Sequence, residues 1–326
     1  MFMEQPEKTP KVSVCVITYN HEKYIRQCLQ SIVDQKTDFD FEVIVGDDCS
    51  TDGTRGIVQE FAEKYPEVVK PIFHDTNIGG TKNIVFVHEQ AIGEYIAHMD
   101  GDDFMLPGKL MIQAEELDKN PDCAICVHAM KHFDQQSQHY RKLRPKRIPR
   151  KSDITFLLMN LPFFSHSSKM YRAECRNGLD VVADEILDCY FHVHHSLRGK
   201  ILYLNDLLGV YRLNAGGSSV KENSNSIYKI PAPRLLEWLI DAVEYAGRSE
   251  IDADLINRSK AKCYFDSSYS HLMAKDFKTF QLLINKSYET ARLHNIQLLF
   301  KHLSGVPSAL FFLVRLRAGL RERIWK

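Results

Sequence analysis

The sequence predicts an α/β protein with an open, mostly parallel sheet flanked by helices, followed by a region made of helices alone. Three observations predict this fold class. Short apolar runs rich in β-branched residues recur in the first half, stretches with helical spacing of apolar residues separate them, and strand signals stop beyond about residue 228. Strands separated by helices of ten or more residues imply βαβ crossovers and hence parallel pairing.

The first half alternates strand and helix. Strands are predicted at 11–18, 41–46, 68–73 and 94–99. The first of them, "KVSVCVIT", is apolar almost throughout, as expected of a strand buried on both faces. Helices are predicted from apolar residues at helical spacing over 21–35, over 53–66 and after the segment "NIGGTKN" at 77–83.

Composition narrows the class of protein. Lys plus Arg equals Asp plus Glu, at 42 each in 326 residues, so no bulk field attracts nucleic acid and none is expected as a partner. The N-terminus lacks a secretory apolar stretch, and no apolar run approaches the length that spans a bilayer. Eight cysteines scattered through hydrophobic segments suit reduced thiols, so we expect a cytoplasmic protein.

Polar patches follow three of the predicted strands: "TYNH" (18–21), "DDCSTDGT" (47–54) and "DGDD" (100–103). In open α/β sheets the ligand lies beyond the carboxyl ends of the strands, so the three patches predict one site. Taken alone, "DGDD" also suits a solvated turn. Asp100 and Asp102 lie two residues apart in an extended segment, so both carboxylates can face one Mn²⁺ or Mg²⁺ ion.

The other patches suit a nucleotide diphosphate. Asp47 or Asp48 can accept hydrogen bonds from a base or from ribose hydroxyls, and Lys82 can reach a phosphate. The alternative is that Asp48, Ser50 or Asp52 caps the next helix, which we favour for Ser50 and Asp52.

The order of these motifs resembles glycosyltransferase family 2 with the GT-A fold, over roughly residues 11–220. The resemblance implies a nucleotide-diphosphate sugar donor (UDP-sugar first), a divalent metal held by the D-x-D motif, and inversion at the anomeric carbon. It places Thr18 and Asn20 at the nucleotide, Asp47 and Asp48 at base and ribose, Asp100 at ribose and metal, and Asp102 as the main metal ligand. The acceptor it implies is a glycan or lipid-linked glycan of the surface-polysaccharide or lipopolysaccharide type.

The family also implies a general base on a helix after the D-x-D motif. Asp188 stands eleven residues before Gly199, at the distance typical of that base, and Asp184 and Glu185 are the rival candidates. The segment "LLGVYRLNAGG" resembles a family motif whose arginine, here Arg212, lies near the diphosphate. Asn214 stands where the family commonly has a histidine.

We divide the chain into a flexible N-terminus (1–10), a catalytic domain (11–225) and a helical region (226–326). The catalytic domain has a nucleotide-sugar half at 11–105 and an acceptor half at 106–225. The helical region either completes the acceptor side or mediates assembly, self-association included. Two functions other than glycosyl transfer stay open, a non-catalytic sugar-nucleotide-binding assembly protein and a sugar-1-phosphate nucleotidyltransferase. Against the second, the loop after the first strand lacks the G-x-G-T-R motif.

Three weaker signals concern surfaces. The segment 140–151 holds seven basic residues, and it is either a solvated linker or a docking site for an anionic acceptor. His192 and His195 either line the acceptor cleft or pack, and "SHSS" (165–168) either contacts the acceptor or forms an ordinary strand. The C-terminal segment 307–326 either lies on an anionic membrane surface, at the inner face of the cell membrane, or packs as a buried helix.

Overall fold

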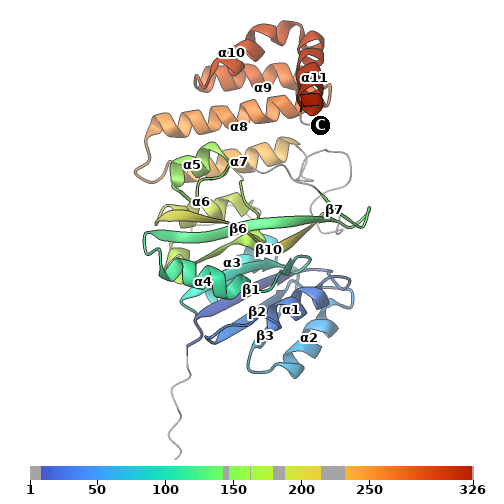
Figure 1. The fold of residues 1–326 in the computed structure, drawn as a ribbon, viewed down its shortest axis with the longest axis vertical. Coiled ribbons are helices and arrows are strands. Elements are labelled where there is room, and N and C mark those ends of the chain that lie inside the picture. The colour runs from blue at the N-terminus through green and yellow to red at the C-terminus, as the bar shows by residue number, and fades with distance from the viewer. Residues whose placement is uncertain (1–8, 142–146, 162, 179–187, 214–231, 325–326) are drawn as a thin grey trace, which may run out of the picture. The chain divides into compact units, whose positions relative to one another are not determined.

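The protein is described by a computed structural model that covers residues 9–141, 147–161, 163–178, 188–213 and 232–324 (Figure 1). Most of the N-terminus predicted to be flexible, together with Asp184, Glu185 and Asn214, lies outside these residues. The chain divides into two compact units, one formed by residues 1–157 and 162–229 and the other by 158–161 and 230–326. Each unit is described below by itself.

The first unit is built on one mixed sheet with strand order β3-β2-β1-β4-β9-β6-β10-β5. Its first part pairs in parallel and consists of β1 (Val12–Thr18), β2 (Phe41–Asp47), β3 (Val69–Phe73) and β4 (Tyr95–Asp100). These are the four strands predicted from the sequence. Six of the seven residues of β1 are buried, because helices cover both faces of a parallel sheet of this kind.

Helices connect these strands, namely α1 (Ile25–Val33), α2 (Thr54–Lys64) and α3 (Gly80–Glu89). The first two lie within the predicted ranges, whereas α3 begins at Gly80, inside the segment 77–83 that we expected to precede it. In α1 the buried residues recur at three- and four-residue intervals, namely Ile25, Cys28, Leu29 and Ile32. Parallel pairing through these crossovers brings the carboxyl ends of β1, β2 and β4 to one edge of the sheet.

The second part of the sheet is mostly antiparallel. It contains β5 (Phe104–Met105), β6 (Cys123–Asp134), β7 (His139–Arg141), β8 (Lys151–Ser152), β9 (Met170–Arg172) and β10 (Lys200–Leu213). The short strand β9 runs antiparallel between β4 and β6, and β6 pairs in parallel with β10. The helical segments here are α4 (Lys109–Asp118), α5 (Ile154–Met159), η1 (His166–Ser168), η2 (Ala173–Arg176) and α6 (Asp188–Ser196).

The segment "SHSS" is therefore not a strand. Residues 166–168 form the short 3-10 helix η1, and it places Ser167 beside the end of β4. The sequence shows only polar residues between two apolar runs at this point, which does not distinguish a strand from a single helical turn.

The second unit is helical, as predicted. Its described elements include α7 (Ala232–Ala246), α8 (Ala253–Met273), α9 (Phe277–Thr290), α10 (Asn295–His302), η3 (Leu303–Gly305) and α11 (Pro307–Ile324). Leu310 and Phe311 of α11 belong to the apolar core of this unit, whereas Phe312 and Leu313 are exposed. The C-terminal helix thus packs through one face. Among the described helices, none has both the length and the apolar character needed to span a bilayer.

Candidate active site

The ends of β1, β2 and β4 are bonded to one another. The backbone N–H of Asp48 donates to the carbonyl of Thr18 (3.0 Å), and that of Gly101 donates to the carbonyl of Ile17 (2.8 Å). A Cβ added at Gly101 would lie 2.9 Å from the side chain of Thr18, so the acidic turn after β4 packs directly on the end of β1. The three polar patches predicted to form one site do lie together.

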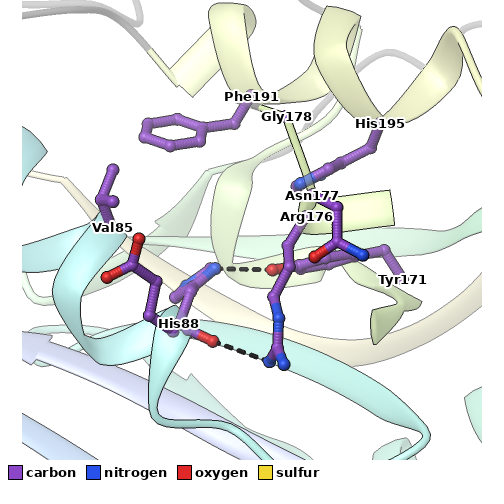
Figure 2. Close-up of a pocket in the computed structure, with 9 residues that line it drawn as sticks. Val85, His88, Tyr171, Arg176, Asn177, Gly178, Phe191 and His195 are labelled. Atoms are coloured by element: carbon purple, nitrogen blue, oxygen red, sulfur yellow. Dashed lines mark hydrogen bonds between the residues drawn. The ribbon is translucent and has the colours of Figure 1, made fainter. Parts of the chain in front are cut away.

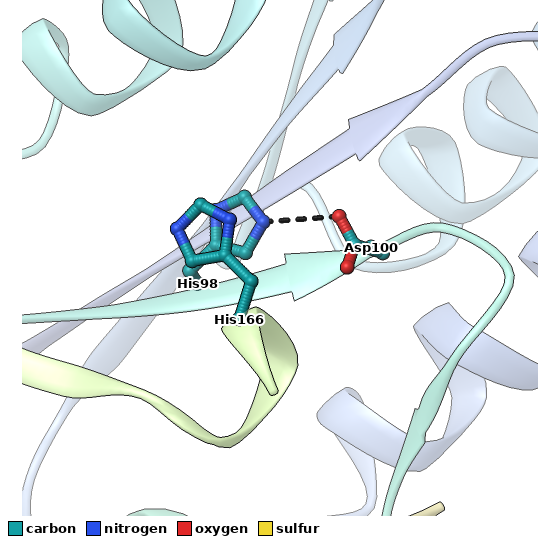
Figure 3. A group of neighbouring side chains, drawn as sticks. All are labelled: His98, Asp100 and His166. Atoms are coloured by element: carbon teal, nitrogen blue, oxygen red, sulfur yellow. Dashed lines mark hydrogen bonds and ion pairs between the residues drawn. The ribbon is translucent and has the colours of Figure 1, made fainter. Parts of the chain in front are cut away.

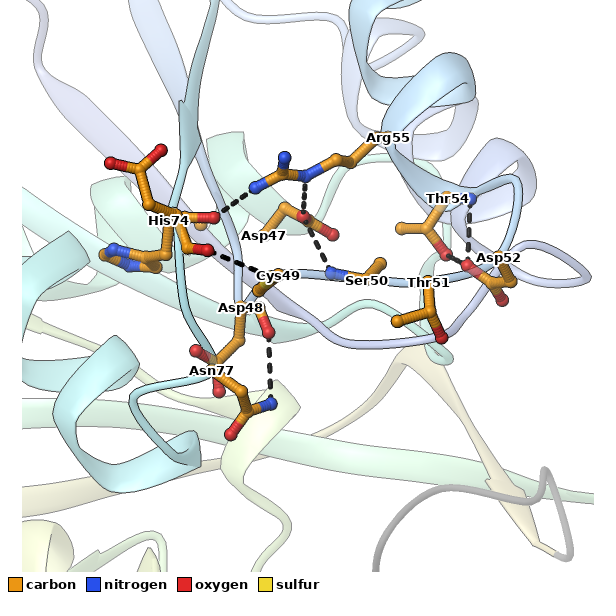
Figure 4. Close-up of polar contacts among 12 residues, drawn as sticks. Asp47, Asp48, Cys49, Ser50, Thr51, Asp52, Thr54, Arg55, His74 and Asn77 are labelled. Carbon is orange, nitrogen blue, oxygen red and sulfur yellow. Dashed lines mark hydrogen bonds and ion pairs between the residues drawn. The ribbon is translucent and has the colours of Figure 1, made fainter.

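The turn after β2 is closed by its own carboxylates (Figure 4). Asp47 is fully buried, and its Oδ2 accepts from the Arg55 guanidinium (2.7 Å) and from the backbone N–H of Ser50 (3.1 Å). Asp48 is buried as well, and its two oxygens accept from the backbone N–H groups of Ile78 (2.7 Å) and Gly79 (3.0 Å). Asp48 therefore ties the end of β2 to the loop that opens α3. The other carboxylate oxygen of Asp47, Oδ1, is buried without a partner among the described residues.

Two residues of this region hold a left-handed backbone. Asn20, after β1, has φ 55°, and Cys49, after β2, has φ 61°. Asparagine tolerates this conformation, whereas for cysteine it is strained. Backbone strain of this kind is concentrated at ligand sites. The side-chain oxygen of Asn20 accepts from the backbone N–H of Thr51 (2.8 Å). The backbone N–H of Asn20 donates to Ser50 Oγ (2.9 Å). Ser50 thus supports Asn20 and does not cap α2, while Asp52 accepts from the N–H of Thr54 at the start of α2.

Asp100 is held by two donors. His98 Nε2 lies 3.1 Å from its Oδ1, and Ser167 Oγ donates to its Oδ2 (3.0 Å) while accepting from its backbone N–H (3.1 Å). Desolvation acts to raise the pKa of Asp100, but the hydrogen bonds from His98 and Ser167 outweigh it and hold the pKa below its ordinary value. The carboxylate is therefore ionised and fixed in orientation.

Asp102 and Asp103 have fewer partners than Asp100 to stabilise their ionised forms. The carboxylate of Asp102 has no ion-pair partner among the described residues, and desolvation together with the charge of Asp100 raises its pKa. Asp103 is almost fully buried, and one of its oxygens has no partner within the described part of the chain. Desolvation and repulsion from Asp102 and Asp100 raise the pKa of Asp103 well above its ordinary value. Ionising all three carboxyl groups of the acidic turn is therefore unfavourable unless a cation binds there.

Arg212, which we expect near the diphosphate, lies at this turn and bonds to it. Its backbone N–H donates to Asp103 Oδ1 (2.8 Å) and its guanidinium donates to the carbonyl of Asp102 (3.0 Å) and to Gln27. The guanidinium also lies over the rings of Tyr24 and Phe104. Arg212 is buried, so β10 and the acidic turn are locked together and the arginine adds positive charge beside the carboxylates.

Asp100 also belongs to a group of three potential metal ligands (Figure 3). One ligand atom from each of His98, Asp100 and His166 lies within 4.8 Å of the others. The two imidazoles are stacked, with ring centroids 3.5 Å apart and planes 11° from parallel. Lone pairs lie in the ring plane, so stacked imidazoles do not aim at one ion, and both nitrogens of His98 already have hydrogen-bond partners. Asp100 and Asp102 are therefore the better match for a hard divalent cation, because their donors are carboxylate oxygens.

Asp188 begins the described part of α6. Its Oδ1 is buried without a hydrogen-bond partner among the described residues. Desolvation, with the charge of Asp100 second, raises the pKa of Asp188 to about 6, and the nearby charge of Lys169 opposes this rise. Lys169 is itself fully buried, and burial lowers its pKa to about 7. Asp188 thus stands apart from the acidic turn yet within reach of its field, with a pKa matched to proton transfer near neutral pH.

Lys82 lies exposed in the first turn of α3, which follows Gly79 at φ 90°. The helix begins beside Asp48, so Lys82 lies on the same side of the site as the Asp47–Asp48 turn. His192 and His195 of α6 are buried, and the two nitrogens of His192 have no hydrogen-bond partner in the part of the chain that the structure describes.

His98, Lys109 and Lys169 were not predicted, and Ser167, which lies in the segment 165–168 expected to contact the acceptor or form a strand, was not predicted to bond to Asp100. His98 could have been found, because residues two apart on a strand share a face and His98 precedes Asp100 by two. The others had no local signal. Lys109 donates to the carbonyl of Ser167, and burial lowers its pKa to about 7.

Comparison with known proteins shows which family the chain resembles. Residues 13–177 match the profile of Glycosyl transferase family 2. The protein Rv1520 of Mycobacterium tuberculosis is 36% identical over 208 residues, which is 63% of this chain and 60% of that protein. The poly(ribitol-phosphate) beta-N-acetylglucosaminyltransferase TarS of Staphylococcus aureus is 29% identical over 265 residues, 76% of this chain and 44% of TarS. The chain therefore spans about half of the length of these curated relatives.

Two solved structures share the fold. The crystal structure of TarS residues 1–349 in complex with UDP-GlcNAc superposes with a TM-score of 0.62 at 20% identity, covering 93% of this chain and 89% of that one. The mannosyltransferase PcManGT of Pyrobaculum calidifontis, in complex with GDP-Man and Mn²⁺, gives a TM-score of 0.58 at 15% identity, covering 93% of this chain and 87% of that one. At these identities the likeness concerns the fold, which is the GT-A arrangement expected from the sequence.

Proposed function

The chain belongs to glycosyltransferase family 2, and from this premise we propose that it moves a sugar from a nucleotide-diphosphate sugar to an acceptor hydroxyl with inversion. One observation carries the proposal. Asp100 is ionised and oriented, with a pKa below its ordinary value, while Asp188 has a raised pKa of about 6. Carboxylates whose environments push their pKa values apart are suited to different roles in one reaction, here charge binding and proton transfer.

The donor occupies the edge formed by the ends of β1, β2 and β4. Thr18, Asn20, Asp47 and Asp48 contact the nucleoside, and Lys82 contacts a phosphate. The strained backbone at Cys49 supports a ligand at this edge. Oδ1 of Asp47, which has no partner among the described residues, is an acceptor left over for a base or ribose donor. A UDP-sugar is the first choice, because the TarS structure holds UDP-GlcNAc.

Mn²⁺ or Mg²⁺ fits the acidic turn. Asp102, which lacks an ion-pair partner among the described residues, and Asp100 would hold the ion, and the cost of ionising all carboxyl groups of this turn without a cation supports one there. A bound divalent ion neutralises charge on a departing diphosphate. Arg212 keeps the backbone of the turn in place through the carbonyl of Asp102 and adds a second positive charge on the same side.

Asp188 acts as the general base. Its ionised form accepts the proton of the acceptor hydroxyl as that oxygen attacks the anomeric carbon, and the protonated carboxyl later returns the proton to water. Attack from the side opposite the diphosphate inverts the anomeric centre. The buried oxygen of Asp188 that lacks a partner within the described residues leaves one acceptor site for that hydroxyl.

The acceptor is a glycan or a lipid-linked glycan at the cytoplasmic face of a membrane. In the described part of the basic segment, Arg141, Arg150 and Lys151 form ion pairs with Asp134, Glu116 and Asp122 of the same unit, so these three side chains give little support to a docking role. The exposed Phe312 and Leu313 of α11, beside Arg315, support reversible contact with an anionic surface.

This surface contact can be tested without disturbing the core. Phe312→Ser with Leu313→Ser should reduce co-sedimentation with anionic vesicles at low salt by several-fold and leave donor hydrolysis unchanged. If the double variant changes the molar mass in light scattering and not vesicle binding, the face mediates self-association instead.

The test of the function itself is a panel of nucleotide sugars with Mn²⁺, Mg²⁺ or chelator. We expect one donor to raise the melting temperature in the presence of metal and to release its nucleotide diphosphate slowly. A non-catalytic binding protein would show the thermal shift and release no nucleotide diphosphate at any protein concentration. A nucleotidyltransferase would form pyrophosphate with a nucleoside triphosphate and a sugar phosphate.

A further inference from the structure

A buried chain of hydrogen bonds runs from the acidic turn to Tyr171 of β9. Asp100 Oδ1 lies 3.1 Å from His98 Nε2, His98 Nδ1 lies 3.0 Å from His88 Nε2, and His88 Nδ1 lies 2.8 Å from the hydroxyl of Tyr171. The four residues come from β4, α3 and β9. Figure 3 shows the His98–Asp100 end, and Figure 2 shows the bond between His88 and Tyr171.

The donors in this chain can point in only one direction. Asp100 is ionised and accepts, so His98 Nε2 carries the proton. Burial favours neutral imidazole, so His98 Nδ1 accepts and His88 Nε2 carries a proton. His88 Nδ1 then accepts from the Tyr171 hydroxyl. The reverse direction would need a protonated Asp100, which the second donor, Ser167, also disfavours.

We propose that His88 and Tyr171 are positioning residues of the acidic turn, which act by holding His98 as the Nε2–H tautomer that orients Asp100. The part of this inference that concerns catalysis rests on the proposed function. A carboxylate that binds metal and ribose works best when the group behind it cannot rotate or change tautomer, and residues behind metal ligands commonly have this role.

Ring stacking restrains two members of this hydrogen-bond chain, His98 and Tyr171. His98 stacks on His166 at 3.5 Å between ring centroids, and Tyr171 stacks on His195 at 3.8 Å with planes 16° from parallel. His98 is fully buried and does not line the cavity described below, so water does not easily replace a partner that its Nδ1 loses. Removing the His88 donor therefore leaves an unsatisfied nitrogen in the interior, which is costly.

The end of the hydrogen-bond chain at His88 and Tyr171 lies at a cavity that the acidic turn does not line. His88 and Tyr171 line a cavity of about 210 Å³, together with Arg176, Phe191 and His195 (Figure 2). None of the acidic-turn residues lines this cavity. Arg176 donates to the backbone carbonyls of His88 (3.1 Å) and Ala91, so the end of α3 is held in place independently of the chain. Along the hydrogen bonds, an effect of His88 or Tyr171 on Asp100 travels through His98.

The test uses Tyr171→Phe and His88→Phe, which remove one donor each and keep a ring. The matched control is Tyr95→Phe, because Tyr95 is an equally buried tyrosine of the same sheet whose hydroxyl donates to Asp118 (2.6 Å), away from the acidic turn. Long-range ¹H–¹⁵N spectra report the tautomer of His98, whose signals are identified by their loss in His98→Gln. The second readout is the Kd of UDP in the presence of Mn²⁺.

We expect wild-type His98 and the Tyr95→Phe variant to show one Nε2–H tautomer with a hydrogen-bonded Nδ1. In His88→Phe the Nδ1 signal should shift and the tautomers should mix, with UDP·Mn²⁺ binding weakened about 10- to 100-fold. Tyr171→Phe should show the same changes, smaller, by several-fold. If His88→Phe does not fold, Tyr171→Phe alone decides.

Unchanged His98 signals and wild-type affinity in both variants would overturn the inference, as would equal weakening in Tyr95→Phe. Failure of the proposed function looks different. In that case wild-type protein binds no nucleotide diphosphate with metal, while the His98 spectra still decide whether His88 and Tyr171 hold its tautomer.

Discussion

Two pairs of aspartates follow strands of the same sheet, and their surroundings differ. Asp47 and Asp48, after β2, are buried and neutralised locally, by the Arg55 guanidinium and by two backbone N–H groups. Asp100 and Asp102, after β4, face a turn in which only Asp100 has side-chain donors among the described residues. The first pair holds a loop closed, and the second belongs to a turn whose full ionisation is unfavourable without a cation.

The difference shows that some aspartates of the site stabilise its loops, while others are suited to bind a charged ligand. Asp47 and Asp48 hold the turn through buried hydrogen bonds and one ion pair, so loss of a partner should lower stability, while Oδ1 of Asp47 stays available to a ligand. In the second group three carboxyl groups lie beside one arginine, Arg212, so their full ionisation raises the free energy of the empty protein, and a cation bound there would recover that cost. The predictions below separate these two roles.

The largest effect should come from the second pair. Asp102→Asn removes the main proposed metal ligand, so transfer should fall by about 10⁴-fold, the equivalent of ~5 kcal/mol of lost charge stabilisation. The melting temperature without ligand should not fall, since repulsion in the turn is relieved. Donor binding is measured by calorimetry with and without Mn²⁺. Wild-type activity in this variant, or full wild-type activity in chelator, would remove the metal from the proposal.

Asp188→Asn should lower turnover by roughly 10²–10⁴-fold, the usual contribution of a positioned base, while donor affinity stays near wild type. This combination distinguishes Asp188 from Asp102, whose loss affects binding first. Steady-state kinetics with saturating donor measures it. Should Asp184→Asn or Glu185→Gln give this result and Asp188→Asn not, one of those two carboxylates is the base.

Removing a partner of the first pair, Asp47 and Asp48, should lower the stability of the protein. Arg55→Met leaves Asp47 buried without its cation, which should lower the free energy of unfolding by about 2–3 kcal/mol. This is less than for a fully buried pair, because the Arg55 side chain is 38% exposed. Urea denaturation followed by circular dichroism measures it. Arg26→Met is the control, because Arg26 and Glu60 form a pair of similar length on the surface, and its loss should have no measurable effect.

The smallest effect concerns pH. Burial raises the pKa of Asp188 to about 6, and only the ionised form accepts a proton. The value of kcat/KM should therefore be constant above about pH 7 and fall about tenfold per unit below pH 6, at pH values where the protein remains folded. The residual activity of Asp188→Asn should lack this step. A wild-type profile that stays level down to pH 5 would show that Asp188 is not the group that titrates.

By itself, the sequence determined the alternation of strands and helices, the strand ends at which polar residues gather, and the helical character of the last hundred residues. These features depend on hydrophobic periodicity and on residues close together in the chain. The pairing of His98 with Asp100 was within reach of the same reasoning, because residues two apart on a strand share a face.

Only the tertiary structure decided which partners surround those residues. Ser167 reaches Asp100 across 67 residues, and Arg212 reaches the carbonyl of Asp102 across 110. Periodicity shows which face of a strand or helix is buried, but not what packs against it, because that depends on the order of strands in the sheet. For this reason Asp47 and Asp100 look alike in the sequence, yet one is paired with Arg55 while the other belongs to a turn whose full ionisation is unfavourable without a cation.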